Sequence, residues 1–289
     1  MALLMRILKF GIPAGIILMA ALFYFVGNQF TRPLDYKVPP LAANEERLDI
    51  KANDGVRVAA SYFPATQKDA PGILLLHGNQ ASREMYGSHI EWLKAAGYAV
   101  LAIDFRGHGE SQAETRSFGF HEARDAHAAF AWLKQKQNGA RVGVIGASLG
   151  GAAALTGEDG PLPADAMVLK AVYPTIREAI YNRIASRGGG LLATVLEPML
   201  SYQSYFRFGA DPAKVSPITG ASKFTGPAFV IGGEQDRYTP LSETTALSKA
   251  FKGPSEIWIL KGLGHDEATG LDDPEYRKRV LAFFGQALR

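Results

Sequence analysis

The chain has 289 residues, of which 47% are hydrophobic and 20% charged, as in a packed globular protein and unlike a disordered chain. Its net charge of +3 is too small to argue for a nucleic-acid-binding protein, which needs strongly clustered lysine and arginine. The absence of cysteine excludes disulfides, thiol catalysis and cysteine-ligated metals, and the length fits one large α/β domain or two small ones.

The first thirty residues form a separate element. Arg6 and Lys9 precede seventeen uncharged, almost wholly apolar residues, 10–26. As a helix this run would be about 26 Å long, close to the ~30 Å hydrocarbon core of a bilayer. We expect residues 1–30 to be an uncleaved single-pass membrane anchor, with a cleaved signal peptide and a buried helix as the alternatives. The bulky residues 22–26 disfavour a signal peptide, because its cleavage site needs small residues.

The segment after the anchor predicts how the rest of the chain is attached. Residues 31–45 include Pro33, Pro39 and Pro40 and are expected to form an extended tether. The positive charges before the apolar run place the N-terminus in the cytoplasm, so we expect the catalytic domain, residues 46–289, on the extracytoplasmic (periplasmic) side of a membrane.

From residue 46 the pattern is that of an α/β domain. Two alternating stretches, 46–51 and 56–63, flank an Asn-Asp-Gly turn and predict a β-hairpin. Continuous apolar runs predict strands that are covered on both faces. These runs are residues 72–77, 98–103, 142–145, 166–173, 228–231 and 256–260. Helical periodicity between them, most clearly in residues 120–136, implies a mostly parallel sheet with helices on both faces.

One connection is far longer than the sheet requires. About fifty residues, 174–224, lie between two strands, and we expect a helical cap insertion at about 175–224 over the carboxyl edge of the sheet. The alternative is one long helix followed by a linker, because Gly188–Gly190 could be a flexible break. The segment is rich in aromatic residues, among them Tyr181, Tyr202, Tyr205, Phe206 and Phe208.

The stretch 141–151 carries the strongest chemical signal. A short apolar strand leads into Gly146-Ala-Ser148-Leu-Gly150, and a helix of small residues follows. A serine on a sharp strand-to-helix bend needs very small neighbours two residues away, because strand and helix pass close together. The G-x-S-x-G spacing in this context predicts that Ser148 is a nucleophile held above the sheet.

A nucleophilic serine needs a base and an acid that orients the base. His265 follows the last predicted strand in a glycine-rich loop, and Asp236 follows the strand before it. Both therefore lie where parallel strands end and ligands gather, in the order Ser…Asp…His. Glu234 and Asp266 are rival acids, the first close to its strand and the second adjacent to the base. The remaining histidines, of which His89 and His108 are the alternative bases, are His77, His89, His108, His121 and His127.

The oxyanion of an acyl-transfer reaction needs two hydrogen-bond donors. We expect the backbone N–H of Leu149 to be one, and the backbone N–H of Asn79, in the loop after strand 72–77, to be the other. His77 is expected to have a structural role beneath this loop. The segment 104–111 predicts a tight hydrogen-bonded loop, since it lacks the glycine and lysine spacing of a phosphate-binding loop.

Together these motifs resemble the α/β-hydrolase superfamily, in particular its bacterial serine-hydrolase and membrane-tethered esterase or acyl-hydrolase branch. The resemblance covers about residues 46–289 and implies hydrolysis of an ester, thioester or amide through an acyl-serine intermediate, with no metal and no organic cofactor. A serine at 148, where dehalogenases have aspartate, argues against a dehalogenase. The motifs are His77-Gly-Asn, Asp104-x-Arg-Gly-x-Gly-x-Ser111, Gly146-x-Ser-x-Gly150, Asp236 and Gly264-His265.

The function expected from the sequence is therefore that of a serine hydrolase for a small acyl ester or thioester. The anchor favours a lipid-like substrate delivered from the bilayer. One alternative is an aminopeptidase-like serine peptidase, for which the cap offers Arg177, Arg183, Arg187 and Glu197 as pocket residues. Another is a non-catalytic, membrane-tethered binding module that kept the fold.

Overall fold

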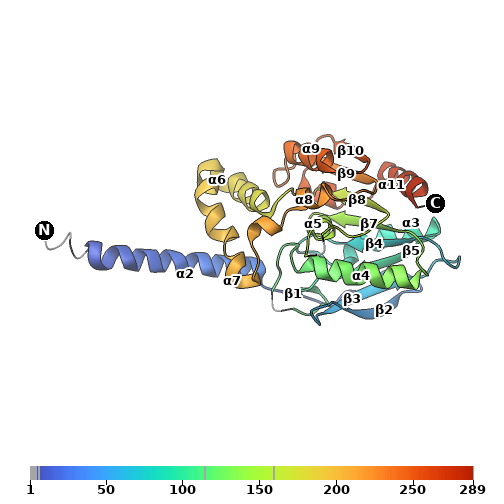
Figure 1. Ribbon diagram of the computed structural model, residues 1–289, viewed down its shortest axis with the longest axis horizontal. Coiled ribbons are helices and arrows are strands. Elements are labelled where there is room, and N and C mark those ends of the chain that lie inside the picture. Colours follow the sequence, from blue (N-terminus) through green and yellow to red (C-terminus); the bar gives the residue numbers. More distant parts are fainter. Residues whose placement is uncertain (1–4, 6, 114, 159, 289) are drawn as a thin grey trace.

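The computed structural model describes residues 5, 7–113, 115–158 and 160–288 (Figure 1). Arg6, whose charge enters the predicted anchor topology, lies outside the described residues. A long N-terminal helix projects from a layered body, and the C-terminus lies on the opposite side of that body (Figure 1).

The body is built on an eight-stranded sheet with the order β10-β9-β8-β7-β4-β5-β3-β2. Neighbouring strands are parallel from β10 to β5, and the pairs β5–β3 and β3–β2 are antiparallel. The predicted hairpin and mostly parallel sheet are thus confirmed. The strands are β2 (Glu46–Lys51), β3 (Arg57–Phe63), β4 (Gly72–Leu76), β5 (Ala99–Ile103), β7 (Val142–Ala147), β8 (Ala166–Lys170), β9 (Ala228–Gly233) and β10 (Ser255–Leu260).

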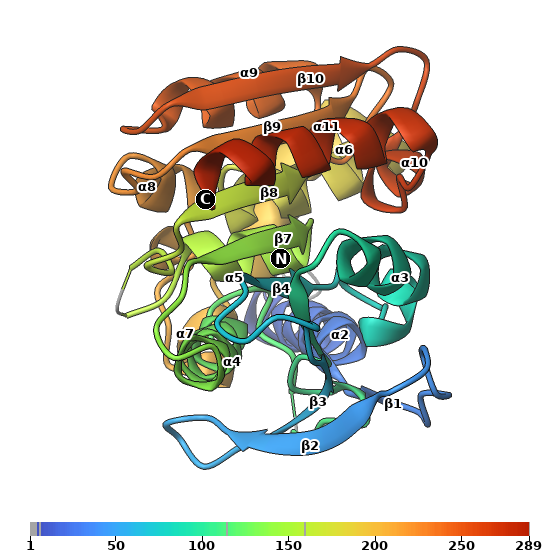
Figure 2. The ribbon, with the colours of Figure 1, turned by 90° about the vertical axis from the view of Figure 1, so that its right-hand side faces the viewer.

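Helices cover both faces of the sheet, which is why the central strands are continuous apolar runs (Figure 2). Phe130 of α4 and Leu149 of α5 belong to the hydrophobic core on one face. Ile90 of α3 and Phe284 of α11 belong to the core on the other. These helices and those near the carboxyl edge are α3 (Gly87–Ala95), α4 (Glu122–Lys136), α5 (Leu149–Leu155), α9 (Leu241–Ala250), α10 (His265–Thr269) and α11 (Pro274–Ala287).

The segment between β8 and β9 is helical, as predicted for a cap. Its first helix, α6 (Ile176–Ser201), is broken at Gly189, which has a φ of 82°. The glycine run thus separates α6 into two helical parts that meet at a kink, since glycine tolerates the positive φ that the kink requires. The segment continues through α7 (Ser204–Phe208), η3 (Pro212–Lys214) and α8 (Pro217–Ala221).

The N-terminal helix α2 (Ile12–Thr31) follows a short π-helix, η1 (Ile7–Gly11). Within the span Lys9–Thr31, the most apolar window of 18 residues has a mean hydropathy of 2.0, and only 6% of that window is buried. This helix is therefore not a core helix of the body, and its length and composition are those of a membrane anchor or a signal sequence.

The residues expected to form an extended tether lie against the body. Strand β1 (Leu34–Asp35) pairs in parallel with β6 (His108–Gly109). The N–H of Leu34 donates to the Gly107 carbonyl oxygen at 2.8 Å. Residues 34–35 are extended, as expected. They also pair with the backbone of the loop that follows β5, and the sequence gives no sign of this pairing.

Candidate active site

Ser148 occupies the bend between β7 and α5. It has φ 47° and ψ −108°, a strained conformation for a residue with a side chain. Close packing holds this bend: a Cβ on Gly146 would lie 2.7 Å from the Gly151 Cα, and one on Gly150 would lie 2.0 Å from the Leu76 carbonyl oxygen. Only glycine fits at either position, so the spacing around the serine is a steric requirement of the bend.

Replacing Gly150 with alanine is therefore expected to lower the free energy of unfolding by about 3 kcal/mol, because backbone atoms cannot move aside for the new methyl group. Gly285→Ala is the matched control. A Cβ at Gly285 meets nothing within 4 Å, and alanine in a helix gains up to about 1 kcal/mol over glycine. Chemical denaturation of both variants measures the difference. Equal stabilities would contradict the close approach at Gly150.

The structure brings Ser148, His265 and Asp236 into one chain of polar contacts. The Ser148 Oγ lies 3.2 Å from the His265 Nε2. The His265 Nδ1 lies 2.7 Å from the Asp236 Oδ2. The other carboxylate oxygen of Asp236 accepts backbone N–H groups of Tyr238 and Thr239, each at 2.8 Å. The carboxylate is thus fixed on one side by the backbone and directed at the imidazole on the other.

The rival residues lie elsewhere. Glu234 accepts a hydrogen bond from the Gly262 N–H at 2.9 Å, and Asp266 is exposed. His89 is buried in α3 with its Nε2 3.4 Å from the Lys170 Nζ. His108 is buried with its Nδ1 3.1 Å from the Arg106 carbonyl oxygen. The other ring nitrogen of His108, Nε2, lies 3.4 Å from the Asn79 side-chain oxygen. Glu234, His89 and His108 are thus bonded to groups other than Ser148.

The loop after β4 lies beside the serine. A Cβ on Gly78 would lie 3.7 Å from the Ala147 carbonyl oxygen and 3.9 Å from the Ser148 Cβ. Asn79 follows at once in this loop. Leu149 is the first residue of α5, and the first N–H groups of a helix have no acceptor within it. Leu149 and the loop that contains Asn79 are therefore both adjacent to the nucleophile, and their roles as oxyanion donors stay a prediction.

The His77 side chain fixes the conformation of this loop through two hydrogen bonds. Its buried Nε2 accepts the Phe105 N–H at 2.9 Å, which leaves the Nδ1 to donate to the Gly78 carbonyl oxygen at 2.7 Å. Burial lowers the pKa of His77, so the ring stays neutral and keeps this tautomer. The predicted structural role of His77 is confirmed.

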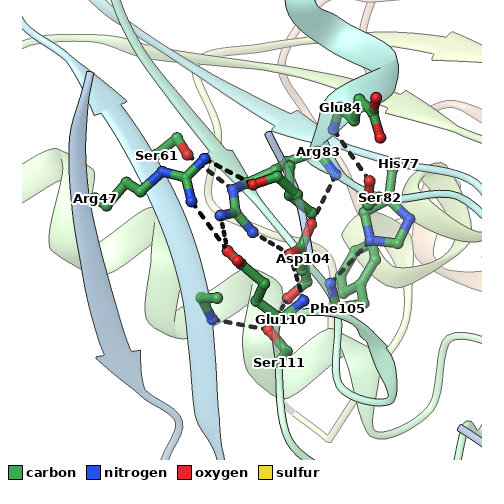
Figure 3. A network of polar contacts seen from close by, with 12 residues as sticks. Arg47, Ser61, His77, Ser82, Arg83, Glu84, Asp104, Phe105, Glu110 and Ser111 are labelled. Atoms are coloured by element: carbon green, nitrogen blue, oxygen red, sulfur yellow. Dashed lines mark hydrogen bonds and ion pairs between the residues drawn. The ribbon is translucent and has the colours of Figure 1, made fainter. Parts of the chain in front are cut away.

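The loop 104–111 is also a scaffold (Figure 3). The Asp104 carboxylate accepts N–H groups from the backbone and guanidinium of Arg83 and the backbone N–H of Glu110. The Ser111 hydroxyl donates to the Asp104 carbonyl oxygen at 2.6 Å and accepts the Ala59 N–H at 2.8 Å. The polar groups of this loop bind one another, as the sequence predicts.

Arg116 is a residue whose place the sequence did not signal. Its Nη1 donates to the Asn79 side-chain oxygen at 2.6 Å. Its Nε and Nη2 donate to the carbonyl oxygens of Arg32 and Phe30, at 2.7 and 2.8 Å. The buried guanidinium therefore joins the end of the N-terminal helix to the loop beside Ser148.

A pocket of about 230 Å³ opens beside His265. Ser186 and Arg187 of the cap and Tyr238 after β9 also line it. A larger hollow of about 700 Å³ lies at β2 and β6, lined by residues such as Arg47 and Glu110, and includes none of the three contacting residues. Among the described residues, no cluster of three or more metal-ligating side chains occurs.

The fold and the Ser-His-Asp arrangement define a hydrolase of the α/β type. The model of the Alpha/beta hydrolase family matches residues 73–276, and the chain belongs to this family.

Three similarities illustrate the range of the family. The chain is 32% identical over 208 residues to lysophosphatidylserine lipase ABHD12 of Danio rerio, covering 66% of this chain and 52% of that protein. It is 26% identical over 232 residues to dipeptidyl aminopeptidase BIII of Pseudoxanthomonas mexicana, covering 73% of this chain and 32% of that one. The esterase Pf2001 of Pyrococcus furiosus has the same fold, with a TM-score of 0.69 and 22% identity over 89% of this chain and 100% of that one.

Proposed function

We propose that the protein is a serine hydrolase that cleaves an acyl ester or thioester through an acyl-serine intermediate. The observation that carries the proposal is the continuous contact chain from the Ser148 hydroxyl through His265 to Asp236. A buried serine in strained backbone geometry, beside an imidazole oriented by a carboxylate, is the arrangement that activates a hydroxyl for attack.

In the first half-reaction, the His265 Nε2 takes the Ser148 proton as the hydroxyl oxygen attacks the acyl carbon. The Asp236 carboxylate stabilises the imidazolium. The N–H groups of Leu149 and Asn79 hold the oxyanion, and one such donor is typically worth about 3 kcal/mol. His265 then protonates the departing alcohol or thiol, and the acyl group remains on the serine.

In the second half-reaction, water takes the place of the leaving group. The His265 Nε2 removes a proton from water, and the hydroxide oxygen attacks the acyl carbon. The Ser148 oxygen leaves and recovers its proton from His265. The acid product and the free enzyme result, so one substrate and one water are consumed per turnover.

We further propose that residues 1–30 anchor the protein in a membrane, that residues 31–45 connect the anchor, and that 46–289 form an extracytoplasmic hydrolase domain with its cap at about 175–224. The proposal is supported by the exposed apolar helix α2. A tether at the bilayer and the similarity to a lysophosphatidylserine lipase favour a lipid-like acyl substrate.

A peptidase activity is the second candidate. The similarity to a dipeptidyl aminopeptidase and the position of Arg187 in the pocket beside His265 favour it. Arg177 and Glu197 bind each other at 2.8 Å and give it less support. The two candidates differ in kcat/KM for p-nitrophenyl acyl esters against aminoacyl p-nitroanilides. We expect the esters to be preferred, and a preference for the anilides would support the peptidase instead.

Arg116→Ala is expected to lower kcat about tenfold or more with little change in KM. The change removes the 2.6 Å bond to the Asn79 side-chain oxygen and leaves it only the longer 3.4 Å contact with His108 Nε2, so the loop that contains Asn79 can shift. Arg116→Lys should recover part of kcat, since lysine can donate to the same oxygen. The control is Arg124→Ala, which removes ion pairs to Asp54 and Glu158. Steady-state kinetics with a soluble ester checks all three variants. If the kcat values of the three variants simply followed their melting temperatures, Arg116 would have only a structural role.

A further inference from the structure

The cap carries an unusual apolar surface beside the N-terminal helix. Leu191 is 85% exposed and Phe206 is 65% exposed, although both are large and apolar. Exposed apolar side chains that cluster in this way mark an interaction surface. We call this surface the cap face; its residues are Leu191, Leu192, Val195, Met199 and Phe206.

The cap face is continuous with α2. The Gln203 Nε2 donates to the Phe23 carbonyl oxygen at 2.9 Å, and the Tyr24 and Phe206 rings stack with centroids 6.3 Å apart. The Arg207 guanidinium lies 4.6 Å over the Tyr24 ring. In Figure 1, α6 and α7 lie on the side of the body from which α2 projects. The cap thus docks on the last part of the candidate membrane helix.

This docking limits the helix that is free to cross a bilayer. Fourteen residues, 9–22, precede Phe23, whose carbonyl oxygen accepts the hydrogen bond from Gln203, and at 1.5 Å per residue they span about 21 Å. A hydrocarbon core is ~30 Å thick. If α2 spans this hydrocarbon core, residues 9–22 are too short to fill it. The core must then extend to Phe23 and beyond, where the cap packs. Phe25 and Phe30 of α2, 59% and 52% exposed, continue the apolar surface at that level.

The side chains around the cap face fit the edge of a membrane. Tyr202 and Tyr205 are half exposed with rings stacked 6.1 Å apart, and tyrosine favours the membrane–water interface. The Arg207 guanidinium donates to the Tyr24 carbonyl oxygen, and long cationic side chains can bury their stems while the charge stays near water. A helix that lies in the membrane–water interface typically has exposed apolar side chains flanked by aromatic and cationic ones.

We propose that the cap face is embedded in the bilayer beside α2, so that both α2 and the cap face attach the domain to the membrane. The inference rests on the proposed membrane anchor. It also deepens the proposed function, because α6 supplies Arg187 to the pocket at His265 and, past the break at Gly189, Leu191 to the cap face. An amphiphile that leaves the bilayer at Leu191 would then have its acyl carbonyl near the pocket, because Arg187 is only four residues away along α6.

Single cysteines test this proposal, because the native chain has none. Leu191→Cys, Ile17→Cys and Ile257→Cys would each carry an environment-sensitive fluorophore in the full-length protein, reconstituted in phosphatidylcholine nanodiscs at one copy per disc. All three positions expose a large apolar side chain; Ile17 is in α2, and Ile257 on β10 is the control away from the cap. We expect brominated lipids to quench the labels at 17 and 191, and aqueous iodide to quench the label at 257.

The outcomes separate the two proposals. Lipid quenching at 17 with iodide quenching at 191 would overturn the proposal that the cap face is embedded and would leave the proposed anchor intact. Iodide quenching at 17 would overturn both. A label at 191 that neither agent quenches would show that protein, from within the chain or a second copy, covers the cap face, and this would also overturn the proposal.

Discussion

Ser148→Ala is expected to reduce kcat by about a million-fold, as loss of a serine nucleophile does in hydrolases that use this mechanism. The alanine keeps a side chain at the strained bend and removes only the hydroxyl, so the fold and its melting temperature should be unchanged. Hydrolysis of a p-nitrophenyl acyl ester measures the loss. Ser222→Ala, at an exposed serine outside the site, is the matched control and should retain full activity.

Residual activity within tenfold of the native enzyme in a pure, folded Ser148→Ala sample would exclude Ser148 as the nucleophile. A variant that loses both activity and cooperative unfolding would call for Ser148→Cys, whose thiol should still form an acyl intermediate and release it slowly.

Asp236→Asn is expected to lower kcat by about ten-thousand-fold at neutral pH. The Asp236 Oδ1 accepts the N–H groups of Tyr238 and Thr239, so an asparagine must keep its oxygen there. Its NH₂ group then faces the His265 Nδ1, which has to accept a hydrogen bond and carries no proton. The proton moves to Nε2, where it prevents the imidazole from taking the Ser148 proton.

The control for this variant is Glu234→Gln, a carboxylate-to-amide change at the rival acid, which is exposed and bonded to Gly262. It should leave kcat within a factor of two or so, since exposed hydrogen bonds contribute little. If Glu234→Gln were the damaging change and Asp236→Asn the harmless one, the assignment of the orienting acid would be reversed.

Much of the fold could be predicted because local pattern and tertiary structure agree. Each central strand is a buried apolar run, and the two strands of the predicted hairpin pair around its turn. The convergence of Ser148, Asp236 and His265 was predictable because parallel strands end at one edge, which places their following loops together. The contact distances then depend on packing that no sequence pattern carries.

Some features were beyond the sequence for physical reasons. The predicted strand 166–173 stops at Lys170, because Ala171 has a φ of 50° and leaves the extended conformation. Lys170 itself is fully buried, with its Nζ 4.9 Å over the Tyr276 ring, and burial lowers its pKa to about 7. A lone lysine in an apolar run gives no sign of such an environment.

The contacts of the N-terminal segment were also hidden, because they use backbone carbonyl oxygens. Gln203 and Arg116 donate to the carbonyls of Phe23 and Phe30, which every residue type provides. Sequence patterns identify apolar faces and chemical side chains, and long-range side-chain-to-backbone bonds leave no such pattern. The docking of the N-terminal helix on the cap and on the loop that contains Asn79 therefore appears only in three dimensions.

In the proposed mechanism, one imidazole activates one serine. Fluorophosphonates react only with activated serines, so the decisive measurement is to incubate the native protein with one and to locate the added mass by peptide mass spectrometry. We predict one adduct, on the peptide that contains Ser148, with labelling lost in His265→Ala. A protein that stays unlabelled while folded, or an adduct on a different serine, would contradict the account.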